Sequence, residues 1–127
     1  MQRSKVYEKN EQKKIMEYAK YRKELKWLFA IPNGGSRNLI EAVSLKAQGV
    51  KSGVPDMFLP LASCGYHGLF IELKVGKNKV SENQKEFINE ISKNGFLCVV
   101  CYGADETIEI IEKYLKGEIC ERKNQPS

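Results

Sequence analysis

The most constraining feature of the sequence is the segment 69–75, in which apolar residues recur at every second position. On an extended strand Leu69, Ile71 and Leu73 leave one face, whereas Glu72 and Lys74 leave the other. A second apolar segment, 56–61, precedes it across the loop 62–68. The pattern predicts a hairpin with one face packed into a core and two charged side chains together on the opposite face.

The hairpin predicts a pair of facing carboxylates. If the two strands pair around a centre at Cys64, Asp56 falls directly opposite Glu72. Cross-strand partners have Cβ atoms about 4.5–5.5 Å apart, and like charges at that distance repel. A shared proton or a bound Mg²⁺ or Mn²⁺ would relieve the repulsion. Lys74 would stand beside the pair, where it could orient a water or stabilise charge on a phosphate.

A plain structural interpretation of the same residues stays open. An Asp at a strand start and an alternating Glu-Leu-Lys also suit a half-exposed strand without a site. A register change of one residue would separate Asp56 from Glu72.

The remaining elements predict an α/β fold, with a small mixed β-sheet flanked by helices in a single domain, 1–127. In chain order we expect a helix at 5–26, a strand at 27–31, a helix from a Ser36 cap to Gly49, strands at 56–61 and 69–75, a helix at 81–95, a strand at 96–102 and a helix at 105–116. Ser81 and Gln84 match a capping box at the start of the third helix. The core spans about 8–115, and a polar tail, 117–127, is expected to fray.

Composition excludes several classes of protein. The chain has 127 residues, of which 42% are hydrophobic and 29% charged, as in ordinary soluble domains and unlike collagen, disordered tails or disulfide scaffolds. No apolar run is long enough to span a membrane, and the charged start carries no secretory signal, so we expect a cytoplasmic protein.

Charge is concentrated at one end. The net charge of +5 lies wholly in residues 1–26, which hold nine Lys or Arg against four Glu. Such a segment either attracts phosphate backbones or forms a solvated helix face.

The four cysteines are expected to be free thiols in a reducing compartment. Cys98 and Cys101 lie three apart on a predicted buried strand, so they point to opposite faces, and a zinc site would need further ligands. His67 is the only histidine, lies alone in a loop, and is not expected to be catalytic.

Several segments together resemble one nuclease family. Pro55-Asp56, fifteen intervening residues and Glu72-Leu73-Lys74 match the signature of the PD-(D/E)XK superfamily. The surrounding segments are Ile31-Pro32-Asn33-Gly34-Gly35, Gly49-Val50-Lys51-Ser52-Gly53-Val54, Tyr66-His67-Gly68 and Ser81-Glu82-Asn83-Gln84. With these, the chain resembles the VRR-NUC group, in the small stand-alone form typical of phages and prophages, over about residues 8–115.

The resemblance implies a restriction-endonuclease-like core and a nuclease that uses Mg²⁺ or Mn²⁺, without a nucleotide cofactor, to hydrolyse phosphodiester bonds in DNA. It implies a homodimer that resolves Holliday (four-way) junctions, in the cytoplasm of a bacterial host or phage-infected cell. A general or restriction-type endonuclease or nickase, a silent DNA-binding module and a small scaffold protein remain alternatives.

The resemblance also assigns roles to residues. Asp56 and Glu72 would bind the metal, the Leu73 carbonyl would complete the site, and Lys74 would be the catalytic lysine. Glu8 best matches a helix glutamate of the family, with Glu11 as the alternative, although Lys9 stands where many small members carry histidine.

Further residues are candidates for support and for DNA contact. Gln84 and Asn33 match positions that would support the site, although the cap alone could explain Gln84. Basic residues in the flanking turns would contact phosphates without reading sequence: Arg37, Lys51, Lys77 and Lys79.

Overall fold

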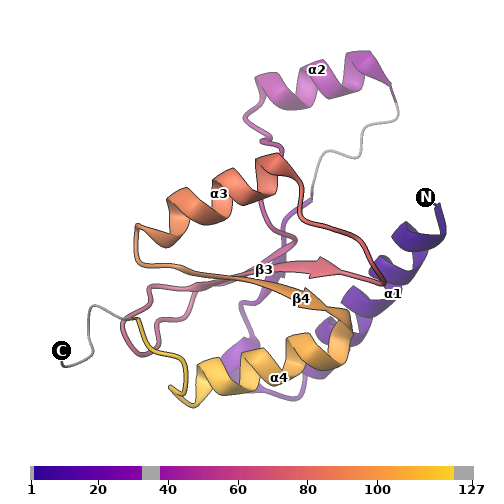
Figure 1. The fold of residues 1–127 in the computed structure, drawn as a ribbon. Coiled ribbons are helices and arrows are strands. Elements are labelled where there is room, and N and C mark those ends of the chain that lie inside the picture. Colours follow the sequence, from indigo (N-terminus) through magenta and orange to yellow (C-terminus); the bar gives the residue numbers. More distant parts are fainter. Residues whose placement is uncertain (1, 33–37, 122–127) are drawn as a thin grey trace.

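The chain folds into a mixed sheet between two layers of helices (Figure 1). This computed structural model describes residues 2–32 and 38–121, and all statements below concern those residues. The elements are α1 (Gln2–Ala19), the 3₁₀ turn η1 (Lys23–Leu25), β1 (Phe29–Ala30), α2 (Leu39–Ala47), β2 (Met57–Leu59), β3 (Leu69–Lys74), α3 (Glu82–Ser92), β4 (Leu97–Tyr102) and α4 (Gly103–Leu115). The predicted α/β class and the small mixed sheet are confirmed.

The sheet has the order β1-β2-β3-β4. β1 and β2 pair antiparallel, as do β2 and β3, whereas β3 and β4 run parallel. Met57 pairs with Ile71 and Leu59 with Leu69, which is the predicted register around Cys64. β2 is shorter than expected and begins one residue after Asp56. The backbone of Asp56 is nevertheless tied to the edge of the sheet, because Ile31 N–H donates to its carbonyl at 2.7 Å.

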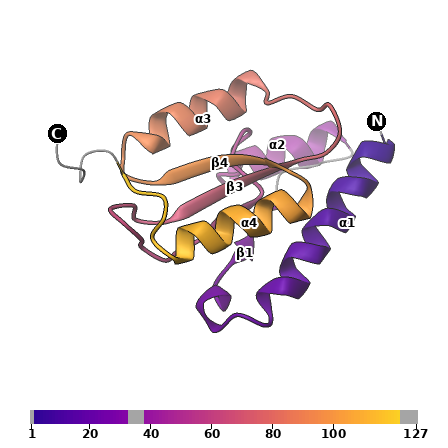
Figure 2. The same ribbon diagram turned by 60° about the horizontal axis from the view of Figure 1, so that its bottom comes forward.

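The main core lies on one face of the sheet. Met57, Ile71 and Leu73 are fully buried there, together with Ile15 of α1 and Ile111 of α4. Figure 2 shows α1 and α4 on this side and α3 on the other. The second face carries an aromatic cluster in which Phe70 contacts Phe87 of α3. Burial of the alternating apolar residues therefore fixes which face Glu72 and Lys74 occupy.

Some predicted boundaries are wrong. The first helix ends at Ala19 instead of residue 26, and the chain then turns through η1 with Arg22 extended. This break brings both Leu25 and Leu28 into the core, where they are 2% and 4% exposed. Asn38, not Ser36, caps α2, because its side chain accepts a hydrogen bond from Glu41 N–H. Ser36 itself lies outside the described residues.

The helix α2 stands away from the sheet (Figure 1). None of its residues is buried. Leu39, Ile40 and Val43 are 78%, 83% and 59% exposed, although their spacing is that of an apolar helix face. Across the described residues, no helix has the length and apolar character needed to cross a membrane.

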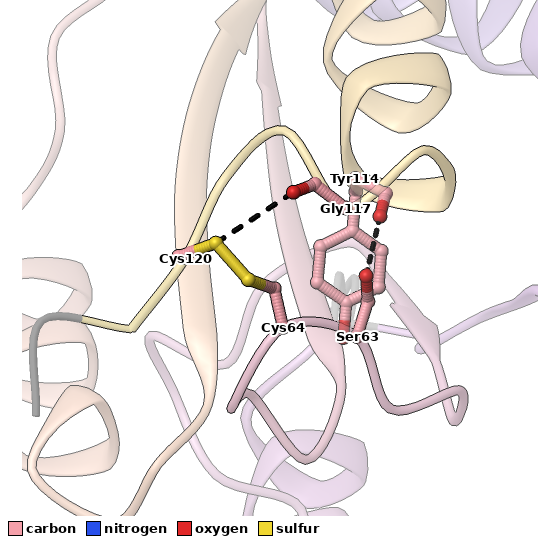
Figure 3. Close-up of a disulfide and its surroundings, with 5 residues drawn as sticks. All are labelled: Ser63, Cys64, Tyr114, Gly117 and Cys120. Carbon is pink, nitrogen blue, oxygen red and sulfur yellow. Dashed lines mark hydrogen bonds between the residues drawn. A yellow bond between two sulfur atoms is a disulfide. The ribbon is translucent and has the colours of Figure 1, made fainter. Parts of the chain in front are cut away.

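The expectation of four free thiols is wrong for two of them. Cys64 and Cys120 form a disulfide that closes 56 residues of sequence (Figure 3). The end of α4 is held against the loop before β3, because Tyr114 Oη donates to the Leu61 carbonyl and Ser63 Oγ donates to the Tyr114 carbonyl, each at 2.6 Å. The chain after α4 then folds back onto the same loop, where Glu121 N–H donates to the Cys64 carbonyl at 2.9 Å. The part of the predicted tail that includes Cys120 is thus anchored, while Cys98 and Cys101 are free as expected.

We expect Cys120→Ser to lower the free energy of unfolding by roughly 2–4 kcal/mol, because the cross-link restricts the unfolded chain. Urea unfolding under non-reducing conditions measures the loss. Cys98→Ser is the matched control and should leave the disulfide in place. A thiol count of four in the native, unreduced protein would contradict the disulfide.

Candidate active site

Two carboxylates meet at the point where β2 and β3 diverge. Asp56 lies just before β2, after the buried Pro55. Its Oδ2 accepts a hydrogen bond of 2.7 Å from the backbone N–H of Leu73, one residue beyond Glu72. The carboxylate of Asp56 is therefore held against β3, and its charge acts on Glu72.

Glu72 is buried, with 2% of its surface exposed. Its Oε2 accepts a hydrogen bond of 3.0 Å from Gln84 Nε2 and lies 3.5 Å from the ammonium of Lys74. Its Oε1 is buried and accepts no hydrogen bond from the described residues. A buried carboxylate oxygen without a partner is costly, so an additional ligand of opposite charge would be stabilised at this position.

The protonation of Glu72 reflects the same environment. Burial, followed by the nearby charge of Asp56, raises the pKa of Glu72 from 4.5 to about 8. Lys74 opposes it by favouring the ionised form. Near neutral pH, and without a cation, Glu72 therefore retains a proton. A divalent cation at this position would displace that proton.

The donor chemistry fits a hard divalent cation. Asp56 and Glu72 offer carboxylate oxygens, the ligands that Mg²⁺ and Mn²⁺ prefer, and Glu72 Oε1 has no other partner among the described residues. Within the described part of the chain, however, no three His, Cys, Asp or Glu side chains lie close enough together to hold a metal. The pair would then depend on waters, a carbonyl or substrate oxygens for the remaining positions. The role of the Leu73 carbonyl as a metal ligand stays a prediction.

The two glutamates proposed on the first helix differ in their surroundings. Glu11 Oε1 accepts a hydrogen bond from Ala104 N–H at the start of α4, and Glu11 Oε2 forms an ion pair of 2.7 Å with Lys14. These contacts lower the pKa of Glu11, and the contact with Lys14 has the largest effect. Glu11 is thus engaged in joining α1 to α4. Glu8 lies half-buried one turn earlier on α1, and its role as a metal ligand stays a prediction.

Gln84 joins helix α3 to the carboxylate pair. Its Oε1 accepts from Ser81 N–H and its backbone N–H donates to Ser81 Oγ, which confirms the predicted capping box. The same side chain donates through Nε2 to Glu72. The cap and the contact with Glu72 are therefore both real, and the cap holds the amide in the orientation that Glu72 needs.

A cavity of about 630 Å³ opens beside Gln84, between α2, the loop 50–54 and the start of α3. Lys46 and Lys51 line it. Gly53 permits the tight packing of this loop, because its φ is +90° and a Cβ there would lie 2.5 Å from the Asn83 carbonyl oxygen. Lys46 was not among the predicted residues. Its signal was a pair of lysines on either side of the turn at Gly49.

The other predicted residues are placed as follows. Lys77 lies in the loop after β3 and lines a separate cavity, and Lys79 is exposed in the same loop. Asn33 and Arg37 lie outside the described residues. His67 precedes β3, at the opposite end of the strand from Lys74, and packs edge-on against Phe96.

Comparisons with known proteins identify the family and support the fold. The family model of the VRR-NUC domain matches residues 2–105. A solved structure described as a VRR_NUC domain protein superposes with a TM-score of 0.79 and 31% sequence identity, over 94% of this chain and 97% of that one. No curated protein matched the chain.

The raised pKa of Glu72 predicts a pH-dependent stability in chelator. Between 4.5 and about 8 the folded protein holds a proton that the unfolded chain has lost. Stability should therefore fall as pH rises through this window, by at most about 1.4 kcal/mol per pH unit from this group. Thermal unfolding in EDTA across the window measures the slope.

Glu72→Gln should flatten that slope, because a neutral amide cannot lose the proton. Glu109→Gln, at an exposed position of α4, is the control and should keep it. An unchanged slope in Glu72→Gln would show that other groups cause it.

Proposed function

Because the chain belongs to the VRR-NUC family and so carries a nuclease domain, we propose that it is a Mg²⁺- or Mn²⁺-dependent endonuclease acting on DNA. The observation that carries the proposal is the environment of Glu72. A buried carboxylate faces Asp56, on the sheet face that also carries Lys74, and its Oε1 has no hydrogen-bond partner among the residues that the structure describes. Such a pair is unfavourable in the protein alone and favourable around a divalent cation.

Each residue of the site has a distinct part in the proposed hydrolysis. Leu73 N–H holds Asp56, and Gln84 holds Glu72, so both carboxylates are oriented before substrate binds. Lys74 is 12% exposed and keeps its ammonium beside Glu72, where it can orient an attacking water and stabilise negative charge on the phosphate. When bound, a divalent cation supplies Lewis acidity to the scissile phosphate and acidifies water.

The cavity beside Gln84 is the proposed groove for the DNA backbone. Lys46 and Lys51 line it, and Ser52 Oγ is held by Asn83 of α3. Lysines contact phosphates as point charges and do not distinguish bases. The groove therefore supports recognition of the shape of the DNA, not of a base sequence.

We propose that the enzyme acts as a homodimer on four-way junctions. One chain carries one site and makes one cut, so symmetric cutting requires two chains. The exposed apolar face of α2, formed by Leu39, Ile40 and Val43, supports this assembly. A second copy would bury that face, and the proximity of α2 to the groove would place two sites on one branched substrate.

We expect the purified protein to make paired nicks in a labelled four-way junction with Mg²⁺ or Mn²⁺, and none with EDTA. Flaps, forks, duplex and single strands complete the panel. Glu72→Ala should reduce cleavage by at least about a hundredfold, since one side of the carboxylate pair is lost. Glu109→Ala, an exposed glutamate of α4, should cut like the native protein.

Cleavage of every duplex at similar rates would assign a general or restriction-type endonuclease instead. DNA binding without cleavage under all metal conditions would assign a silent binding module. Absence of both would leave the chain with neither proposed activity.

Ile40→Glu should convert the dimer to a monomer without unfolding it, because Ile40 is 83% exposed within one chain. Sedimentation and circular dichroism measure the two effects. Trp27→Ser removes another exposed apolar side chain and serves as the control. If the native protein is monomeric, the proposed interface does not exist. If Trp27→Ser dissociates the dimer and Ile40→Glu does not, the interface lies elsewhere.

A further inference from the structure

A second cavity, of about 370 Å³, opens at the end of the sheet where β3 and β4 stop. Its walls come from Tyr7 of α1, the turn 75–78 and Tyr102 at the end of β4. Figure 1 shows the loop after β3 running up to α1 at this edge. The volume falls in the range of roughly 300–1,000 Å³ that small-molecule sites occupy.

This cavity adjoins the proposed catalytic lysine. Lys74 pairs with Tyr102 in the parallel register of β3 and β4, so the two side chains leave the same face of the sheet. The wall of the cavity begins at Val75, the residue directly after Lys74. The cavity therefore lies at the end of the strand that carries the proposed catalytic lysine, and its Tyr102 wall is the strand neighbour of that lysine.

The ring of Tyr102 is held in place although it is exposed. Its hydroxyl donates to the Asn78 carbonyl at 2.7 Å, and its backbone N–H donates to Glu106 Oε2. The residue is still 42% exposed, and Tyr7 on the other wall is 56% exposed. Two exposed aromatic rings, one of them anchored at its polar end, offer apolar faces at little further cost in conformational entropy.

Charge in the cavity suits a nucleotide. Lys77 is an exposed cation on its wall. The one carboxylate in that wall, Glu11, is already engaged by Ala104 N–H and Lys14. An aromatic surface beside a cation is the combination with which proteins bind unpaired nucleotides, the ring stacking on the base and the cation contacting the phosphate.

We propose that this cavity holds one unpaired base of the DNA substrate, stacked on Tyr102, beside the scissile phosphate. The inference rests on the proposed nuclease function and adds the class of substrate. A paired base lies inside the stack and cannot enter, whereas a base at a branch point can leave it at low cost. The cavity would then select branched or locally unpaired DNA.

Abasic substitution of the substrate tests the proposal. In a branched DNA that the native protein cuts, each nucleotide near the cut is replaced in turn by an abasic residue, which keeps the phosphate. At one position we expect the native kcat/KM to fall about 5- to 100-fold, as expected for the loss of one stacked base. In Tyr102→Leu that same substitution should have no further effect, because the stacking partner is already missing.

Matched variants separate stacking from folding. Tyr102→Phe keeps the ring and should retain most of the native dependence on the base. Tyr21→Leu removes a tyrosine that is 86% exposed and lines none of the cavity, and it should behave like the native protein. Unchanged melting temperatures would show that each variant is folded.

Failure of this inference differs from failure of the proposed function. If native protein cuts but the abasic penalty is equally large in Tyr102→Leu, the base does not stack on this ring and the proposal is wrong. If no abasic position affects cleavage, no base is bound and the proposal is also wrong. If the native protein cuts no DNA, the nuclease proposal fails, and the base site falls with it.

Discussion

The register of the β2–β3 hairpin is the constraint on which the rest of the site depends. It brings Asp56 to the strand that carries Glu72, and it assigns Ile71 and Leu73 to the opposite, fully buried face. A shift of one residue would turn the apolar side chains outward and the charged ones inward. The core therefore holds the carboxylates together despite their repulsion, because separating them would expose several buried apolar side chains.

The unfavourable electrostatics of Glu72 are confined to a small part of the structure. Glu72 is buried, and its Oε1 has no hydrogen-bond partner in the described part of the chain, which is unfavourable. Lys74 and the amide of Gln84 partly offset this cost. The capping box of α3 orients the Gln84 side chain, so the hydrogen bonds that cap this helix also position the amide that contacts Glu72. Under the proposed function a divalent cation would relieve this cost, because carboxylate oxygens are the ligands that it prefers.

Much of this structure could be predicted from patterns within short stretches of the sequence. Features that depend on contacts between distant residues could not be predicted. The hairpin register follows from alternation around Cys64, and the Ser81–Gln84 box follows from spacing within one helical turn. The Cys64–Cys120 disulfide depends on how the chain after α4 folds back onto the loop before β3, where Tyr114 and Glu121 contact residues far away in sequence. The position of α2 away from the sheet could not be predicted either, because the spacing of its apolar residues is the same whether that face contacts the sheet or solvent. Tyr102 carries no local sign of its cavity, since the other wall comes from α1.

The two cavities differ in chemistry: one is lined by Gln84, which contacts Glu72, and the other begins directly after Lys74. Under the proposed function this difference bears on specificity. The groove of Lys46 and Lys51 offers cations to a phosphate backbone, which any duplex can supply. The cavity of Tyr7 and Tyr102 offers aromatic faces, which only a base outside the stack can use. Under the proposed function, phosphate contacts alone would permit cutting of all DNA. A requirement that both cavities be filled would restrict cutting to DNA in which a continuous backbone passes beside an unpaired base. Structure-selective cleavage would thus arise from an anchored tyrosine ring beside the proposed catalytic lysine, without the need to read a base sequence.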